Sequence, residues 1–221
     1  MGGAAVRYRL VAVDLDDTLL NGSFEIGPRA RRAVAQAQAR GVLVTLATGR
    51  MYRSARSIAR ELGITAPLIT YQGALVKDAA GREYAHRPVP PAWAREVIGR
   101  LQSRGYHVNV YINDNLYMRV LNDAGKRYAN VSRVPAHVVD DVVEILAMGP
   151  PTKVLAIAEP GEVDRLEREL APAYKGKLHV TKSKPYFLEF SHPLATKGRA
   201  LAAVARWLGV PRQAVLAIGD S

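Results

Sequence analysis

Two carboxylates directly after a short apolar run constrain this chain more than any other feature of its sequence. The run from Leu10 to Val13 predicts a buried strand, and Asp14, Asp16 and Thr18 follow it closely. Carboxylates at the end of a buried strand are costly unless a cation and a reacting group lie beside them. At the end of a parallel strand they would lie in the crevice where open α/β sheets bind ligands. The pattern predicts a phosphoryl-transfer site, and a solvated turn with Thr18 capping the next helix is the plainer alternative.

The two acids can divide the work of a phosphoryl transfer. One carboxylate attacks phosphorus and carries the phosphoryl group as an aspartyl-phosphate, while the other moves a proton. A Mg²⁺ ion would offset the charge that otherwise keeps two anions apart.

A second predicted strand ends in groups that can bind phosphate. The segment from Val42 to Ala47 is apolar and β-branched, and Thr48 and Gly49 follow it directly. A hydroxyl and a flexible backbone amide at one sheet edge can hold phosphoryl oxygens. Arg50 comes next, and its forked guanidinium suits a second anionic group on the substrate. An ordinary surface residue at the start of a helix is an equally good interpretation of Arg50.

Two segments near the end of the chain supply the remaining groups. Lys197 opens a helix rich in Ala and Leu, and its ammonium can neutralise charge on the nucleophile and the phosphoryl group. The apolar run from Ala214 to Ile218 predicts another strand. Asp220, which follows it, can complete the oxygen shell of a metal ion.

Four motifs in this order and at these strand ends resemble the haloacid dehalogenase superfamily of phosphohydrolases. More narrowly, they resemble its Cof-type branch, which carries an inserted α/β cap of the C2B type. The resemblance implies that Asp14 is the nucleophile and that Asp16 is the general acid/base and a metal ligand through its backbone carbonyl. It further implies phosphate binding by Thr48, a third-motif lysine at Lys197, and Mg²⁺ held by Asp14, Asp16 and Asp220.

Two departures from the family pattern stand out. Asp17 occupies a position that is commonly Gly in the family, and we expect a minor effect because Asp tolerates turn geometry. The fourth motif usually continues as G-D-S-x-N-D and is followed by further strands and helices, whereas this sequence stops at Ser221. We therefore expect a fragment that lacks the C-terminal part of the core; the alternative is an enzyme that has lost part of its metal site and sheet.

The overall pattern predicts an α/β fold with a Rossmann-like parallel-sheet core. Helices predicted at residues 28–40 and 52–62 alternate with the strands, which is typical of βαβ units. Prolines at positions 88, 90 and 91 then interrupt the chain. We expect a core formed by residues 1–89 and 189–221, with a cap inserted at residues 90–188.

The insert has its own α/β pattern. Its periodicity predicts two helices and several strands, with a polar turn at Asn113 to Asn115. The predicted helices span residues 92–104 and 162–170, and the predicted strands span residues 106–112, 116–121, 153–158, 178–181 and 186–190.

Composition narrows the class of protein further. The net charge is +11, but the arginines are dispersed along predicted helices without interleaved aromatic residues, which argues against nucleic acid as a partner. The chain has no cysteine, so disulfides and thiolate metal sites are excluded. The sequence shows neither a signal peptide nor an apolar run long enough for a membrane span, and we expect a cytoplasmic protein.

The leading hypothesis is a Mg²⁺-dependent phosphatase that hydrolyses a small phosphorylated metabolite, such as a sugar phosphate, through an aspartyl-phosphate. The cap would close over the leaving group. A phosphomutase with the same motifs is one alternative. A non-catalytic protein that binds a phosphorylated metabolite is the other, although two repelling carboxylates at a strand end argue against it.

Overall fold

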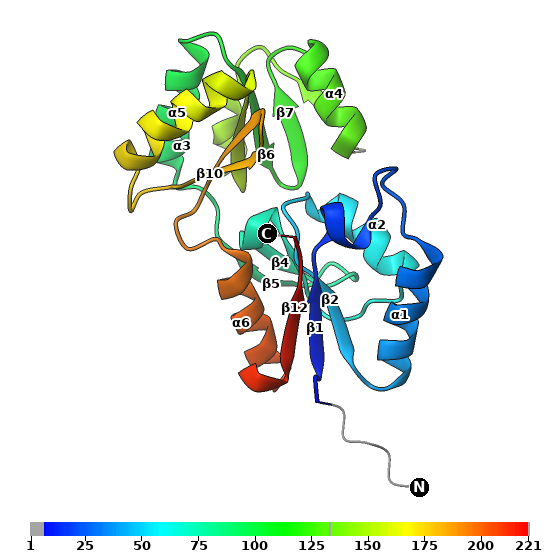
Figure 1. Ribbon diagram of the computed structural model, residues 1–221. Coiled ribbons are helices and arrows are strands. Elements are labelled where there is room, and N and C mark those ends of the chain that lie inside the picture. Colours follow the sequence, from blue (N-terminus) through cyan, green and yellow to red (C-terminus); the bar gives the residue numbers. More distant parts are fainter. Residues whose placement is uncertain (1–6, 133, 221) are drawn as a thin grey trace, which may run out of the picture. The chain divides into compact units, whose positions relative to one another are not determined.

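The computed structural model describes residues 7–132 and 134–220. The chain folds into two compact units, leaving the first after Ala85 and returning to it at Thr196. The core unit therefore combines the two ends of the chain, and the inserted unit runs from His86 to Ala195 (Figure 1). These crossings differ from those expected at 89/90 and 188/189. The second differs because the last strand of the insert, predicted at residues 186–190, extends to Ser191 in the inserted sheet, and the chain returns to the core only at Thr196.

A parallel sheet forms the centre of the core unit, as the sequence predicts. Its strands β1 (Leu10–Val13), β2 (Leu43–Leu46) and β12 (Val215–Ile218) pair in the order β12-β1-β2. A parallel bridge between Ala47 and Ile69 links β2 to β3 (Leu68–Thr70). From there β4 (Leu75–Lys77) and β5 (Glu83–His86) continue a second sheet in the order β3-β4-β5.

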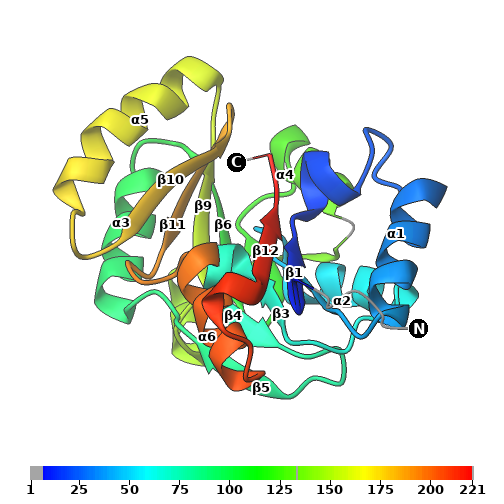
Figure 2. The same cartoon turned by 60° about the horizontal axis from the view of Figure 1, so that its bottom comes forward.

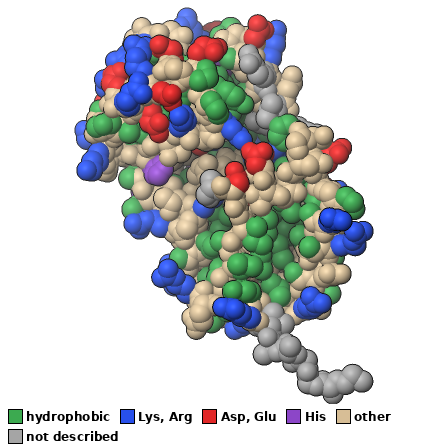
Figure 3. Space-filling model, viewed as in Figure 1, with side chains coloured by type: hydrophobic (Ala, Val, Ile, Leu, Met, Phe, Trp, Pro, Cys, Tyr) green, Lys and Arg blue, Asp and Glu red, His purple; other side chains and the backbone are tan. Residues whose placement is uncertain are grey.

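Three helices accompany this sheet: α1 (Pro28–Ala39), α2 (Tyr52–Glu61) and α6 (Lys197–Trp207). The first two match the predicted spans to within one residue, and each is followed by a glycine of positive φ, Gly41 and Gly63, that ends it. Helix α6 packs on the sheet through a buried cluster that includes Leu10, Ala12, Ala200 and Val204. Figure 3 shows hydrophobic side chains gathered on the visible face of the core unit.

The inserted unit has a six-stranded sheet in the order β10-β11-β9-β6-β7-β8. All its pairings are antiparallel except that of β7 with β8. Its strands are β6 (His107–Ile112), β7 (Asn115–Met118), β8 (Ala136–Val138), β9 (Lys153–Ile157), β10 (His179–Lys184) and β11 (Phe187–Ser191).

Alternation along the strands sends apolar side chains to one face of this sheet. Val108, Val110 and Val154 belong to the buried cluster on that face, together with residues of α3 (Pro91–Gln102) and α5 (Pro160–Ala173). Figure 2 shows these two helices beside the strands. The inserted unit therefore has a hydrophobic core of its own.

Several elements of the inserted unit differ from the prediction, since α4 (Asp123–Ser132), β8 and the short helix Glu144–Met148 were not expected. The strand expected at residues 116–121 ends at Met118, and α4 follows instead of loop. Gly, Asn and β-branched residues lower the helix propensity of this segment, so its periodicity does not stand out. The carboxamide oxygen of Asn122 accepts from the backbone N–H of Gly125 (3.0 Å), which caps the start of the helix.

The polar turn between β6 and β7 is confirmed. Ile112 pairs with Asn115, so Asn113 and Asp114 form a two-residue turn in which both have positive φ (50° and 58°). This is the type I′ turn that suits the twist of a hairpin. No helix in the described part of the chain is long and apolar enough to cross a membrane.

Short single-turn helices complete the structure. They span Tyr71–Gly73, Glu144–Met148 and Arg212–Ala214, and a five-residue turn spans Leu15–Leu19 directly after β1.

Candidate active site

Asp14 is the first residue after β1, and its carboxylate contacts Lys197 from the other end of the chain. Its backbone N–H donates to the carbonyl of Ile218 (2.9 Å), so the ends of β1 and β12 lie side by side. The side chain is buried: Oδ1 accepts from the N–H of Leu15 (2.7 Å), and Oδ2 accepts from Lys197 Nζ (2.5 Å). The structure thus brings together the predicted nucleophile and the predicted third-motif lysine.

Lys197 owes its position to the start of α6. Thr196 caps this helix, because its Oγ1 accepts from the backbone N–H of Arg199 (3.2 Å). Lys197 is therefore the first helical residue, at the end where the helix dipole favours anions.

The turn after β1 breaks the helical pattern at two acidic residues. Asp16 is extended (φ −73°, ψ 137°), and Asp17 is left-handed (φ 56°, ψ 12°). Gly adopts a left-handed conformation without strain, and Asp is among the other residues that tolerate it. Because Asp16 is extended, its carbonyl does not point along the axis of the turn as the carbonyl of a helical residue would.

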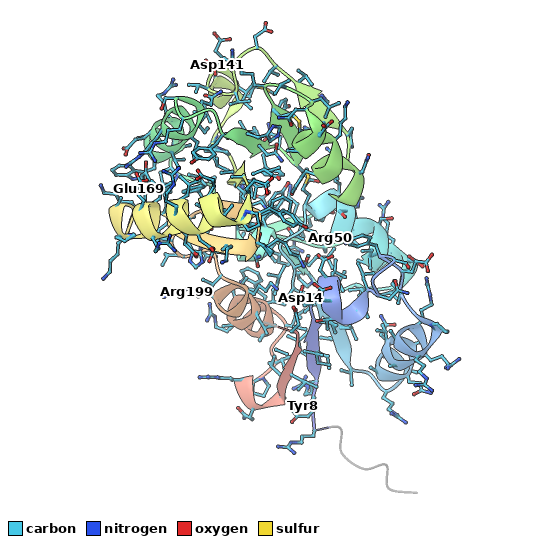
Figure 4. All side chains as sticks on the ribbon, turned by 45° about the horizontal axis from the view of Figure 1, so that its top comes forward. Tyr8, Asp14, Arg50, Asp141, Glu169 and Arg199 are labelled. Carbon is cyan, nitrogen blue, oxygen red and sulfur yellow. The ribbon has the colours of Figure 1, made fainter. Side chains whose placement is uncertain are left out.

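Arg50 holds the carboxylate of Asp16 with two nitrogens. Nη2 lies 2.6 Å from Oδ1 of Asp16, and Nε lies 3.0 Å from Oδ2. The side chains of Arg50 and Asp16 are 12% and 32% exposed, so the pair is partly shielded from water. The sequence left Arg50 between a second anionic group on the substrate and a surface residue at a helix start, and in the structure its side chain contacts the predicted general acid. Figure 4 labels Asp14 and Arg50 among the side chains of the core unit.

Thr48 and Gly49 lie directly after β2. Thr48 is fully buried, and its Oγ1 accepts from the backbone N–H of Arg50 (3.1 Å), which leaves the hydroxyl proton available to an acceptor. At Gly49 an added Cβ would come within 2.6 Å of the side-chain nitrogen of Gln72.

Asp220 lies two residues beyond Ile218, whose carbonyl binds the backbone of Asp14. Its side chain is exposed. In residues 7–132 and 134–220, no group of three or more His, Asp or Glu side chains is arranged to hold a metal ion. The expected ligands need only two such side chains, because Asp16 takes part through its carbonyl. Two carboxylates and one carbonyl, all oxygen donors, fit a hard cation such as Mg²⁺.

One aromatic residue of this site escaped prediction from the sequence. Phe24 has positive φ (58°), and the guanidinium carbon of Arg50 lies 5.5 Å from the centre of its ring. The loop that carries Phe24 is held by Asn21, whose Oδ1 accepts from the N–H groups of Ser23 and Glu25. No sequence signal pairs an aromatic residue in this loop with an arginine after the second strand.

A model of the haloacid dehalogenase-like hydrolases matches residues 11–221 of this chain. The chain belongs to that family. Phosphatase YwpJ of Bacillus subtilis is 26% identical over 96% of this chain and 83% of its own length. A second relative from that organism, 5-amino-6-(5-phospho-D-ribitylamino)uracil phosphatase YwtE, is 27% identical over 96% of this chain and 82% of its own length.

A solved structure agrees with this family membership. The X-ray crystal structure of TM0651 from Thermotoga maritima superposes with a TM-score of 0.84 at 31% identity, covering 97% of this chain and 80% of that one. The present chain is thus an enzyme, a haloacid dehalogenase-like hydrolase of the Cof type. The two curated relatives named above are phosphatases.

Proposed function

We propose that this haloacid dehalogenase-like hydrolase is a Mg²⁺-dependent phosphatase that hydrolyses the phosphate monoester of a small metabolite through an aspartyl-phosphate on Asp14. The contact between Asp14 and Lys197 carries the proposal. It pairs a buried carboxylate with a cation at the end of a parallel strand, where ligands of open α/β sheets bind. The name of the ribitylaminouracil phosphatase supports a small phosphorylated metabolite as the substrate.

In the first step, an Asp14 oxygen forms a bond to phosphorus while the bond from phosphorus to the ester oxygen breaks. Asp16 enters this step protonated and gives its proton to the departing oxygen, which leaves as an alcohol; the water of the second step returns that proton. Lys197 balances negative charge on Asp14 and the phosphoryl oxygens, and the Thr48 hydroxyl donates to one of those oxygens.

In the second step, water attacks phosphorus and the bond to Asp14 breaks, which releases inorganic phosphate. Asp16 takes the proton of that water, and Arg50 fixes the direction in which the Asp16 carboxyl points. Asp14, the carbonyl of Asp16 and Asp220 would hold Mg²⁺. When bound, the ion supplies positive charge that lowers the repulsion between the nucleophile and the phosphoryl group.

A phosphate-release assay against a panel of phosphorylated metabolites tests this function. Wild type should release phosphate in the presence of Mg²⁺, lose this activity in a chelator, and recover it when Mg²⁺ is restored. Asp14→Asn should reduce turnover to the background rate, because an amide keeps the shape of the side chain but cannot attack phosphorus. Asp16→Asn should lower turnover by about 10²–10⁴-fold, because only proton transfer is lost.

Circular dichroism provides the control, since both variants should retain the spectrum of the wild type. If Asp14→Asn releases phosphate at the wild-type rate, Asp14 is not the nucleophile. If the wild type releases phosphate equally well in a chelator, Mg²⁺ is not the cofactor.

A further inference from the structure

The turn that follows β3 holds three consecutive residues in the left-handed region. Tyr71, Gln72 and Gly73 have φ values of 51°, 57° and 96°. Two of them are not glycine, and a side chain in this region raises the free energy of the backbone. Such strain persists only where surrounding contacts impose it, and it concentrates at functional sites.

Contacts on two sides hold this turn in place, one with the residues after β2 and the other with the residue before Lys197. The N–H of Tyr71 donates to the carbonyl of Arg50, and the N–H of Gln72 donates to the carbonyl of Thr48, each at 3.0 Å. On the other side, a Cβ at Gly73 would come within 2.4 Å of the carbonyl oxygen of Thr196. The turn is therefore fixed between the residues that follow β2 and the residue that precedes Lys197.

This clamp places the side chain of Gln72 over Gly49. A Cβ at residue 49 would come within 2.6 Å of its nitrogen, so the carboxamide packs directly on the Gly49 backbone and would have to shift for any other residue there. Within the described part of the chain, the carboxamide of Gln72 makes no hydrogen bond, although the side chain is only partly exposed. A strained turn thus presents an unused donor and acceptor beside the segment from Thr48 to Arg50.

We propose that the carboxamide of Gln72 binds the phosphoryl group of the substrate, donating from Nε2 to a phosphoryl oxygen beside Thr48 and Lys197. The assignment rests on the proposed function, because it names a further ligand of the same phosphate. A neutral amide donor suits this place, since it binds an oxygen without altering the charge balance between Asp14 and Lys197. The strained backbone at Tyr71 and Gln72 then has a function, which is to hold the Gln72 side chain toward the phosphoryl group.

Two variants of Gln72 that keep its length provide the test. Gln72→Met removes both the donor and the acceptor, whereas Gln72→Glu keeps the shape and places a negative charge next to the phosphate. Both should weaken inhibition by inorganic phosphate, and both should lower kcat/KM for p-nitrophenyl phosphate. We expect a loss on the order of 10-fold for Met, typical of one hydrogen bond to a charged group, and a larger loss for Glu.

Gln38→Met is the matched control. Gln38 lies in α1 and donates from Nε2 to the carbonyl of Gly63 (3.1 Å), so the same substitution removes a carboxamide away from the site. It should leave both the inhibition constant and kcat/KM at the wild-type values.

A second readout does not depend on turnover. Inorganic phosphate should raise the melting temperature of the wild type, and this increase should shrink in Gln72→Met and nearly vanish in Gln72→Glu. A turn that matters only for structure would tolerate the isosteric Gln72→Glu and keep the full increase. That result, together with an unchanged inhibition constant, would overturn the assignment.

The two proposals fail in different experiments. Turnover by Asp14→Asn at the wild-type rate would remove the proposed mechanism. Equal phosphate affinity in wild type, Gln72→Met and Gln72→Glu, with Asp14 still essential, would remove only the role of Gln72.

Discussion

Arg50 connects two parts of the site through different groups of one residue. Its guanidinium holds Asp16, 34 positions away, while its backbone N–H donates to Thr48 Oγ1. A planar fork orients a carboxylate better than a rotating ammonium does, because two parallel hydrogen bonds fix the plane of the acid. We infer that Arg50 is a positioning residue that acts through Asp16.

Arg50→Lys and Arg50→Gln should both lower kcat, by on the order of 10-fold, because each loses the two-point contact with Asp16. The KM should change little. In an Asp16→Asn background the same substitutions should have almost no further effect, because the group that they orient is already disabled. Steady-state kinetics of the three single and two double variants measures this coupling.

A rise in KM alone, undiminished in the Asp16→Asn background, would instead assign Arg50 to a second anionic group on the substrate. That was one of the two interpretations of Arg50 that the sequence left open.

The sequence identifies the side chains of the site better than their partners. Asp14 and Lys197 were expected to lie together because each belongs to one of the four motifs, and the structure places them in contact. The pairing of Arg50 with Asp16 depends on side-chain torsions that no spacing encodes. The left-handed backbone at Gln72 was equally hidden, because Gln has no preference for that conformation. The roles of these residues in the reaction stay predictions.

At the scale of elements, two helices of the inserted unit are tied together by one carboxylate. Glu169 of α5 accepts from Arg100 of α3 (2.6 Å) and from Arg104 just beyond it (2.8 Å). The hydrogen bonds from Arg104, followed by those from Arg100, lower the pKa of Glu169 from 4.5 to about 2. The carboxylate therefore favours the folded state while it is ionised.

Glu169→Gln should lower the melting temperature modestly near neutral pH, because exposed ion pairs stabilise little. A pKa that folding lowers contributes stability above the unfolded value of 4.5 and loses it as the pH falls toward about 2. The difference between wild type and Glu169→Gln should therefore be constant above about pH 5 and shrink below it.

Thermal unfolding followed by circular dichroism across this pH range measures the effect. Glu167→Gln on the same helix is the control for removing a charge. A difference from wild type that persisted unchanged at the acidic end would contradict the role of the ionised Glu169.

Elements with strong local signals were predicted closely, and those that depend on long-range packing were not. Helices α1 and α2 begin and end where proline, periodic alanines and glycine indicate. Helix α4 was missed because its own residues favour helix weakly, and Asn122 was not recognised as a cap. Strand β7 was predicted too long, because apolar residues continue past the point where its pairing ends.

At the scale of the whole molecule, the inserted unit has the features of a domain that folds by itself. It has one continuous sheet and a hydrophobic cluster built only from residues between 89 and 190. The chain enters and leaves it once each, at 85/86 and 195/196. The sequence predicted an inserted α/β region from its prolines and periodicity, with a last strand at residues 186–190. The sheet pairing shows that this strand belongs wholly to the inserted sheet, beyond the boundary expected at 188/189.

A polypeptide of residues 86–195 should therefore fold alone and unfold in one cooperative thermal transition. Dispersed amide signals in its NMR spectrum and a sigmoidal melt would be the expected result. A gradual, non-cooperative melt would show that this unit depends on the rest of the chain.

The pairing of β1 with β12 joins two strands that are far apart in the sequence, with Leu10 opposite Val215. On the ribosome, β1 and β2 emerge early, whereas β12 follows only after the whole insert has been made. At about 5–20 residues per second, synthesis of residues 86–195 takes roughly 5–20 s. Throughout that interval Asp14 exists without Lys197, and one edge of β1 is unpaired. The nascent chain must therefore pass through a long-lived state whose exposed strand edge invites wrong partners. The contact between Asp14 and Lys197 therefore cannot form until long after Asp14 has been made.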